Sequence, residues 1–245
     1  MTNNTDCIII IPIYKTNLEF RRFVTIANTY NLYKDKYDIY FICGKSLDIS
    51  KYKLFFPNIP YKFYNDNYFR GQDEYSELML SSFFYEEYIN YKYILIAQDD
   101  AYITNRLNLE YFLNKKYDYI GALSNIPYDL NIDDLMYAYN NNLTLGDFNK
   151  QHNYHLFMNG GLSLRKTDVL YNVLKNHKDV GVEWEDDVIC NILNENNNLY
   201  NTILVKDIIY FGYEDYDHIT FNIYKSNNIV PFGIHNTYEQ FIENI

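Results

Sequence analysis

The chain has 245 residues, of which 48% are apolar and 22% are charged, a composition that excludes a fibrous or disordered protein. One α/β domain of this length can bury a full core, so we expect a single domain over residues 1–245. The formal net charge of -11 disfavours nucleic acid as a partner, because binding its phosphates normally needs a positive protein face.

The cysteines and the amino terminus bear on the cellular compartment. Cys7, Cys43 and Cys190 lie in apolar surroundings without metal-ligand spacing, so we expect reduced core residues. The first residues carry no positive charge, and the apolar run that follows them is too short for a signal peptide or a membrane span. These features predict a cytoplasmic protein, of a bacterium or of a virus-infected host cell.

The first part of the chain alternates between strand and helix patterns. The β-branched run Cys7–Ile13 predicts a strand buried on both faces. Apolar residues at helical spacing over 18–33 predict a helix, with Asn17 as its N-cap. Strands are then expected at Tyr37–Cys43 and Tyr61–Tyr64. This order predicts an α/β fold with a mixed, mainly parallel sheet flanked by helices.

Further elements follow in the same manner. We expect one long helix over Asp73–Tyr88, a buried strand at Tyr93–Ala97 and another strand at Tyr117–Ala122. The polar, Asn-rich segment 127–154 is expected to form a long mobile excursion. The remaining pattern predicts a strand over HLFMNGGLSLRK, a helix from Thr167 to about Asn176, a helix opened by the acids of WEDDV, an aromatic stretch at Ile208–Tyr213, a loop PFGIHN, and a short helix from Thr237.

Gln98, Asp99 and Asp100 directly follow the predicted strand Tyr93–Ala97. Ligands of open α/β sheets bind at the carboxyl ends of strands, and carboxylates buried there are costly unless cations neutralise them. Mg²⁺ or Mn²⁺ prefers carboxylate and phosphate oxygens, so a metal here can bridge the protein and a phosphate-bearing ligand. The alternative is a solvated turn after the strand.

Three adjacent acids, Glu185, Asp186 and Asp187, mark the start of another predicted helix. Acids cap helices routinely, but three exceed what capping needs, and one can act as a general base. His235, in the predicted loop PFGIHN, is either a structural histidine or a metal ligand.

Asn159, Gly160 and Gly161 interrupt a predicted strand. Paired glycines allow backbone geometry or close approaches that a side chain would forbid. They indicate either a β-bulge or a floor on which a sugar lies.

Together and in this order, several segments resemble the GT-A fold glycosyltransferases. The resemblance is strongest to a small family of proposed transferases often found with viral and bacterial polysaccharide genes. The segments that carry it span Cys7 to His235 and are IIIIPIY, SSFFYEEY, ILIAQDDAYI, DYIGAL, NGGLSLRK, EDDV and PFGIH.

The resemblance implies a metal site on a donor diphosphate. In such enzymes the last acid of a DxD motif holds the metal, and Asp100 matches it, while His235 matches a late histidine that completes the coordination. The first acid of the motif is replaced by Gln98, which brings no charge but can bind a ribose or sugar hydroxyl. Asp99 is then placed to help bind the metal in place of the missing acid.

The resemblance also implies a base and a donor pocket. WEDD looks like the acidic motif of inverting members; one alignment makes Asp186 the base, which we favour, and another makes it Asp187. Glu185 would orient the acceptor. The implied donor-binding residues are Pro12, Ile13 and Tyr14 at the first strand end, where Tyr14 can stack on uracil, and Arg70, Asn159, Gly160 and Gly161.

The hypothesis is therefore a metal-dependent glycosyltransferase that uses a nucleotide-sugar, with UDP the expected nucleotide, and a glycan, protein or lipid-linked acceptor. Inversion is expected, with retention as the alternative. A catalytically inactive nucleotide-sugar-binding module is the rival of another class, suggested by Gln98. A nucleotidyltransferase fits less well, because IPIYKTN lacks the glycine of a phosphate-binding loop.

Overall fold

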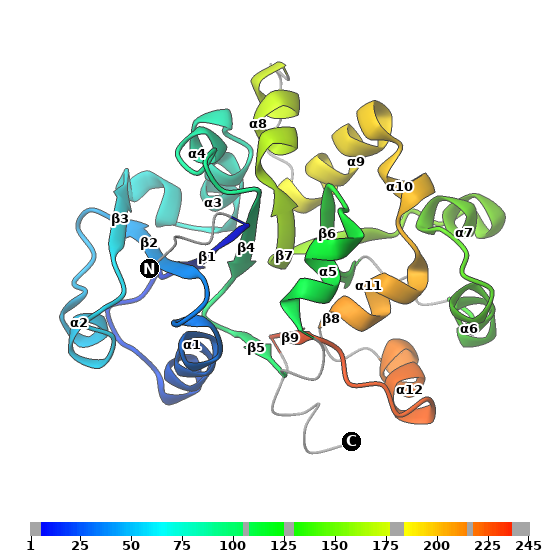
Figure 1. The fold of residues 1–245 in the computed structure, drawn as a ribbon, viewed down its shortest axis with the longest axis horizontal. Coiled ribbons are helices and arrows are strands. Elements are labelled where there is room, and N and C mark those ends of the chain that lie inside the picture. The colour runs from blue at the N-terminus through cyan, green and yellow to red at the C-terminus, as the bar shows by residue number, and fades with distance from the viewer. Residues whose placement is uncertain (1–5, 105–107, 125–129, 177–183, 215–217, 237–245) are drawn as a thin grey trace.

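A computed structural model describes residues 6–104, 108–124, 130–176, 184–214 and 218–236. Its largest feature is a six-stranded sheet in the order β3-β2-β1-β4-β7-β6 (Figure 1). The strands are β1 (Cys7–Pro12), β2 (Asp38–Gly44), β3 (Tyr61–Tyr64), β4 (Tyr93–Ala97), β6 (Tyr119–Ser124) and β7 (Phe157–Lys166). In this sheet β7 is antiparallel to both of its neighbours, β4 and β6, and all other neighbouring strands are parallel. The predicted mixed, mainly parallel α/β sheet is therefore confirmed.

The central strands are buried along their whole length. Every residue of β1 and of β4 is buried, as expected for parallel strands covered on both faces. The predicted bounds of β3 and β4 agree with the structure, and those of β1, β2 and β6 differ by one or two residues. The three cysteines are reduced and buried, as predicted.

Helices cover both faces of the sheet. In Figure 1, α3, α4, α8 and α9 lie on one side, whereas α1, α5 and α11 lie on the other. The helices are α1 (Phe20–Tyr33), α2 (Ser50–Phe55), η1 (Asp66–Phe69), α3 (Gln72–Met79), α4 (Ser82–Glu86), α5 (Leu109–Lys115), α6 (Ile132–Asn140), α7 (Leu145–His152), α8 (Thr167–Asn176), α9 (Glu185–Asn197), α10 (Leu199–Thr202), α11 (Val205–Phe211) and α12 (His218–Ser226). None of them has the length and apolar character needed to cross a bilayer.

A second, three-stranded sheet joins distant segments in the order β5-β9-β8. It contains β5 (Ala101–Ile103), β8 (Gly212–Glu214) and β9 (Gly233–His235). The loop predicted for PFGIHN is therefore wrong, because its middle is a strand paired on both sides. The stretch 208–213 is divided between α11 and β8, and the helix expected from Thr237 lies outside the described residues.

Two predictions about helices are wrong, one on the length of a helix and one on an N-cap, and local polar contacts explain both. The expected helix over 73–88 is divided into α3 and α4, because Ser81 is extended and its hydroxyl donates to the Leu78 carbonyl (2.5 Å). Asn17 does not cap α1, which follows Glu19; its side chain instead accepts a hydrogen bond from Lys51 Nζ (2.7 Å).

The described part of the segment 127–154 contains two short helices, so the expected excursion is wrong there. Each helix buries a small apolar face, with Leu135 in α6 and Phe148 in α7 among the buried residues. Each has a side-chain cap, since Asn131 accepts from the Asp133 amide and Thr144 accepts from the Asp147 amide. The Asn-rich composition concealed these two patterns.

The cap of α7 yields a direct test of this correction. Thr144→Ala removes the cap acceptor and should cost about 1 kcal/mol. Amides of α7 should then exchange about fivefold faster in hydrogen-exchange mass spectrometry. Thr144→Ser keeps the hydroxyl and should exchange like the parent chain. Fast exchange of residues 145–152 in the parent chain itself would contradict the helix.

Candidate functional site

A cavity of about 540 Å³ lies at the carboxyl edge of the large sheet. Its lining includes residues that follow β1 and β4, the point at which the strand order reverses and open α/β sheets bind ligands. Among the lining residues are predicted site residues from six separate segments: Tyr14, Arg70, Gln98, Asp99, Asp100, Asn159, Gly160, Gly161, Glu185, Asp186 and His235. The fold thus brings these distant residues into one place.

Three predicted site residues do not line this cavity. Pro12 is the last residue of β1 and pairs with Ile42, and Ile13 is fully buried in the core. Asp187 Oδ1 instead accepts from Asn191 Nδ2 and lies 2.9 Å from His155 Nε2. Of the two candidate bases, only Asp186 faces the cavity.

The turn after β4 presents two carboxylates to a guanidinium group. Arg22 of α1 forms an ion pair with Asp99, and its Nη2 lies 3.9 Å from Asp100 Oδ2. Burial raises the pKa of Asp99 to about 6, although Arg22 opposes this shift. Asp99 Oδ2 is buried without a hydrogen-bond partner among the described residues, so it is available to a ligand or cation.

His235 lies between two carboxylates. Its Nδ1 is 2.7 Å from Glu214 Oε2, on the parallel neighbour strand β8, and its Nε2 is 3.2 Å from Asp100 Oδ1. Burial disfavours the imidazolium, but Glu214 and Asp100 outweigh it and hold the pKa of His235 well above its usual value. Gln98 Oε1 lies 3.1 Å from the same Nε2. Glu214 therefore fixes the ring and aims Nε2 at the cavity.

The fit of this pair to a divalent cation can be judged from its geometry. Among the described residues, no group of three or more His, Cys, Asp and Glu side chains is arranged to hold a metal alone. However, Asp100 Oδ1 is buried and faces His235 Nε2 at 3.2 Å, and Glu214 holds the far ring nitrogen as a carboxylate does behind a ligating histidine. Asp100 and His235 would therefore fit as two of the ligands of a divalent cation, and they would need further ligands from a bound molecule.

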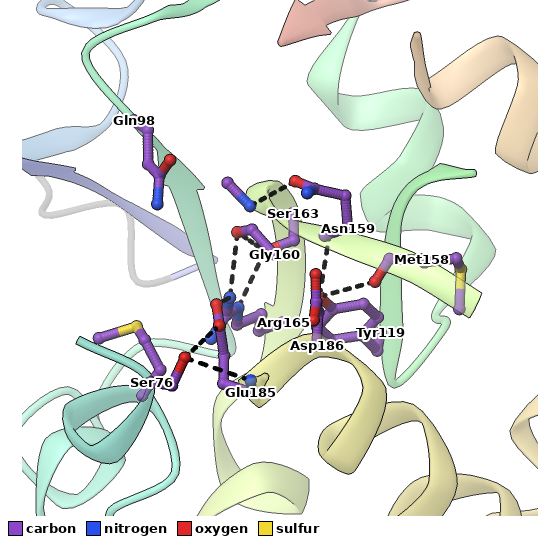
Figure 2. A network of polar contacts seen from close by, with 12 residues as sticks. Ser76, Gln98, Tyr119, Met158, Asn159, Gly160, Ser163, Arg165, Glu185 and Asp186 are labelled. Carbon is purple, nitrogen blue, oxygen red and sulfur yellow. Dashed lines mark hydrogen bonds and ion pairs between the residues drawn. The ribbon is translucent and has the colours of Figure 1, made fainter. Parts of the chain in front are cut away.

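The acids at the start of α9 differ in their surroundings (Figure 2). Glu185 and Asp186 are buried, and the Asp187 amide donates to Asp186 Oδ1 (2.9 Å). Burial, followed by the charge of Glu185, raises the pKa of Asp186 to about 7. Asp186 is thus a cavity carboxyl that gains or loses a proton near neutral pH.

Glu185 is paired with a wholly buried arginine (Figure 2). Arg165 Nη2 donates to the Gly160 carbonyl (3.0 Å) and lies 3.4 Å from Glu185 Oε1, and Ser76 donates to Glu185 Oε2 (3.1 Å). Arg165 also donates to Ser163 Oγ (2.9 Å) and to the Tyr85 hydroxyl (3.0 Å). This network joins α3, β7 and α9, and it fixes the start of α9.

The glycines at 160 and 161 lie in a register irregularity of β7. Gly121 of β6 pairs with Ser163 whereas Leu123 pairs with Met158, so the intervening residues of β7 are bulged. A Cβ at Gly161 would lie 2.3 Å from His235 Nε2, and one at Gly160 would lie 2.3 Å from Glu185 Oε1. The segment is therefore both a bulge and part of the cavity wall, and glycine leaves room for the two site side chains.

Sequence reasoning missed several lining residues, including Arg22, Tyr75 and Glu214. Glu214 follows an aromatic run as Asp99 and Asp100 follow an apolar one, so the same pattern could have identified it. Arg22 lies within an ordinary amphipathic helix, and no local signal marks it. Trp184 was noted only beside the acids, yet it lines the cavity with 56% of its surface exposed.

The Arg165 network is testable by denaturation. Arg165→Met leaves Glu185 buried without its cation and should lower the free energy of unfolding by about 3–5 kcal/mol. Adding Glu185→Gln to Arg165→Met should restore at least ~1 kcal/mol of the free energy of unfolding, since the two residues are coupled. The neighbouring Lys166→Met removes a half-exposed pair with Asp118 and should cost less than ~1 kcal/mol. Additive effects of the first two changes would contradict the pairing.

Comparison with known proteins places the chain in a family. The mannosyltransferase Ktr4p from S. cerevisiae, solved in complex with GDP, is 11% identical, with a TM-score of 0.45. The match covers 81% of this chain and 63% of that chain, so this chain matches less than two thirds of the Ktr4p structure. No curated protein matches. A family model described as "Protein of unknown function (DUF5672)" matches residues 58–235, which is most of the chain, and the protein therefore belongs to this family.

Proposed function

We propose that the protein is a metal-dependent glycosyltransferase of the GT-A type that transfers a sugar from a nucleotide-sugar to an acceptor hydroxyl with inversion. One observation carries the proposal: a single cavity contains the Asp100–His235 pair and also Asp186, whose pKa is about 7. The Asp100–His235 pair suits a donor diphosphate with its cation, and Asp186 suits the role of general base.

The donor half of the cavity has positive groups suited to phosphates. Arg70 and Arg22 both line it, and because Arg22 is shared with Asp99, a bound cation would supply part of the positive charge that an anionic substrate requires. Tyr14 follows β1, packs edge-on against Tyr75 with ring centroids 5.5 Å apart, and is proposed to contact the nucleotide base. UDP remains the nucleotide that we propose.

Asp100 and His235 would hold the divalent cation, Mn²⁺ or Mg²⁺, while Gln98 and Asp99 would contact the donor. When bound, the ion offsets the charge that develops on the departing nucleoside diphosphate. Glu214 would keep Nε2 of His235 directed at the ion, and Arg22 would balance the charge of Asp99.

Asp186 would remove the proton from the acceptor hydroxyl as that oxygen attacks the anomeric carbon. A base is most effective when its pKa is near the working pH, and burial beside Glu185 places Asp186 there. Glu185 is held by Arg165 and Ser76, which suits a residue that orients the acceptor rather than one that exchanges protons.

A nucleotide-sugar-binding module without catalysis is the second candidate. Its support is Gln98, which replaces an acid and lies within hydrogen-bond distance of His235 Nε2. A module of this kind would bind the donor with the same residues, but it would not release nucleotide.

The first test is nucleotide release from UDP-, GDP- and CMP-sugars with Mn²⁺ or with chelator. One donor should be hydrolysed in the presence of metal, and Asp100→Ala should lower that rate at least ~100-fold by removing a metal ligand. Asp168→Ala, an exposed acid outside the cavity, is the control and should retain the rate.

The outcomes separate the candidates. Metal-dependent donor binding without release, even with acceptors present, would support the binding module. Neither binding nor release for any donor would overturn the proposed function.

The second test concerns the base. The carboxylate form of Asp186 is the active one, so the rate should rise with pH through about 7 and then level off. Asp186→Asn should lower the rate by about 10²–10⁴-fold. Asp187→Asn, whose side chain contacts His155 outside the cavity, should keep both the rate and its pH profile.

Donor binding can be followed separately in the same variants. Trp184 is the single tryptophan of the chain and lines the cavity, so its fluorescence should report nucleotide binding. Asp186→Asn should bind the nucleotide like the parent protein. An unchanged rate in Asp186→Asn, or a loss of equal size in Asp187→Asn, would contradict the assignment.

A further inference from the structure

Three large apolar side chains are exposed together where α1 begins and α2 ends. The exposed fractions are 81% for Phe20, 74% for Leu54 and 53% for Phe55. The Phe55 ring packs against Phe23, with centroids 5.1 Å apart, and Phe20 precedes Phe23 by three residues, on the same side of α1. We call Phe20, Leu54 and Phe55 the α1–α2 patch. Exposed large apolar side chains gathered in one region mark an interaction site.

The patch is held on a fixed frame. Lys51 Nζ of α2 donates to Asn17 Oδ1 (2.7 Å), and the Tyr52 hydroxyl donates to the Lys15 carbonyl (2.9 Å). These contacts tie α2 to the segment before α1, so the apolar side chains project from a preformed surface. Figure 1 shows α1 and α2 as neighbours at one side of the fold.

The segment that contains the patch carries a charge opposite to that of the rest of the chain. Residues 15–70 contain ten Lys and Arg against five Asp and Glu, whereas the whole chain contains 21 against 32. Lys15, Lys51 and Lys53 are exposed beside the patch, and the acids close to it are Glu19, paired with Lys15 at 3.5 Å, and Asp48, which accepts from Ser50 at the start of α2. The acidic protein therefore has a positive, apolar region here.

We propose that the α1–α2 patch docks onto an anionic lipid bilayer surface. Aromatic and leucine side chains partition into the headgroup region, while lysines are attracted to anionic lipids. A second copy of the chain fits less well, because a two-fold contact through this patch would bring the same lysines together. The combination of exposed apolar tips and surrounding lysines thus favours lipid as the occupant.

Docking at this place would also orient the cavity. Phe20 begins α1, and Arg22, two residues later, lines the cavity at the carboxyl edge of the sheet. The patch therefore lies near the end of the molecule at which substrates would enter. The inference does not depend on the proposed transferase function, since lipid binding requires no donor.

The test is binding of the full chain to vesicles of phosphatidylcholine with and without phosphatidylserine, measured by co-sedimentation. Binding should require phosphatidylserine and should weaken as salt is raised. Lys51→Glu/Lys53→Glu should weaken it at least ~25-fold, from about fivefold for each positive charge lost near the surface. Phe20→Ser/Leu54→Ser/Phe55→Ser should weaken it by a similar factor or more.

Matched controls keep this test decisive. Tyr137 of α6 is 56% exposed, so Tyr137→Ser removes an exposed ring elsewhere, and Lys175→Glu reverses an exposed charge on α8. Both should bind vesicles like the parent chain, and all variants should keep the parent circular dichroism spectrum. No binding by the parent chain, or equal binding by patch and control variants, would overturn the proposal. A dimer that depends on the patch in light scattering, without lipid binding, would also overturn the proposal.

Discussion

The site depends on how carboxylates are kept at the carboxyl edge of the large sheet. Asp99, Asp100, Glu185, Asp186 and Glu214 all line one cavity, where partial removal from water makes each negative charge costly. Arg22 compensates the pair after β4, Arg165 compensates Glu185, and His235 lies between Glu214 and Asp100, which hold its pKa well above its usual value while no cation is bound. Each compensating group comes from a different element, so the charges themselves join the large sheet to α1, to α9 and to the second sheet.

Asp186 is the exception that gives the cavity its chemical asymmetry. Among the described residues no Lys or Arg forms an ion pair with it, and Glu185 next to it is the buried acid that Arg165 contacts. Protonation of Asp186 from solution is therefore the least costly way to reduce the remaining negative charge of the cavity. One half of the cavity then favours phosphate and a cation, and the other half offers a carboxyl group that titrates near neutrality.

The sequence predicted what is encoded locally. The buried runs of β1 and β4 and the amphipathic pattern of α8 needed no knowledge of distant residues, and the acids after β4 follow from the rule for strand ends. Arg22 was missed because its role arises only when α1 is placed beside Asp99. The strand β9 was missed for the same reason, since three residues acquire strand geometry only through pairing with β5 and β8.

The choice between Asp186 and Asp187 shows the same limit at a finer scale. Both acids lie in the first turn of α9, and a sequence alignment can place either one opposite the substrate. Successive residues of a helix point in directions about 100° apart, so Asp186 and Asp187 have different surroundings. Glu185 is fixed by Arg165 and Ser76, and this sets the rotation of α9 about its axis. The buried arginine thereby directs Asp186 into the cavity and Asp187 toward His155, although it contacts neither.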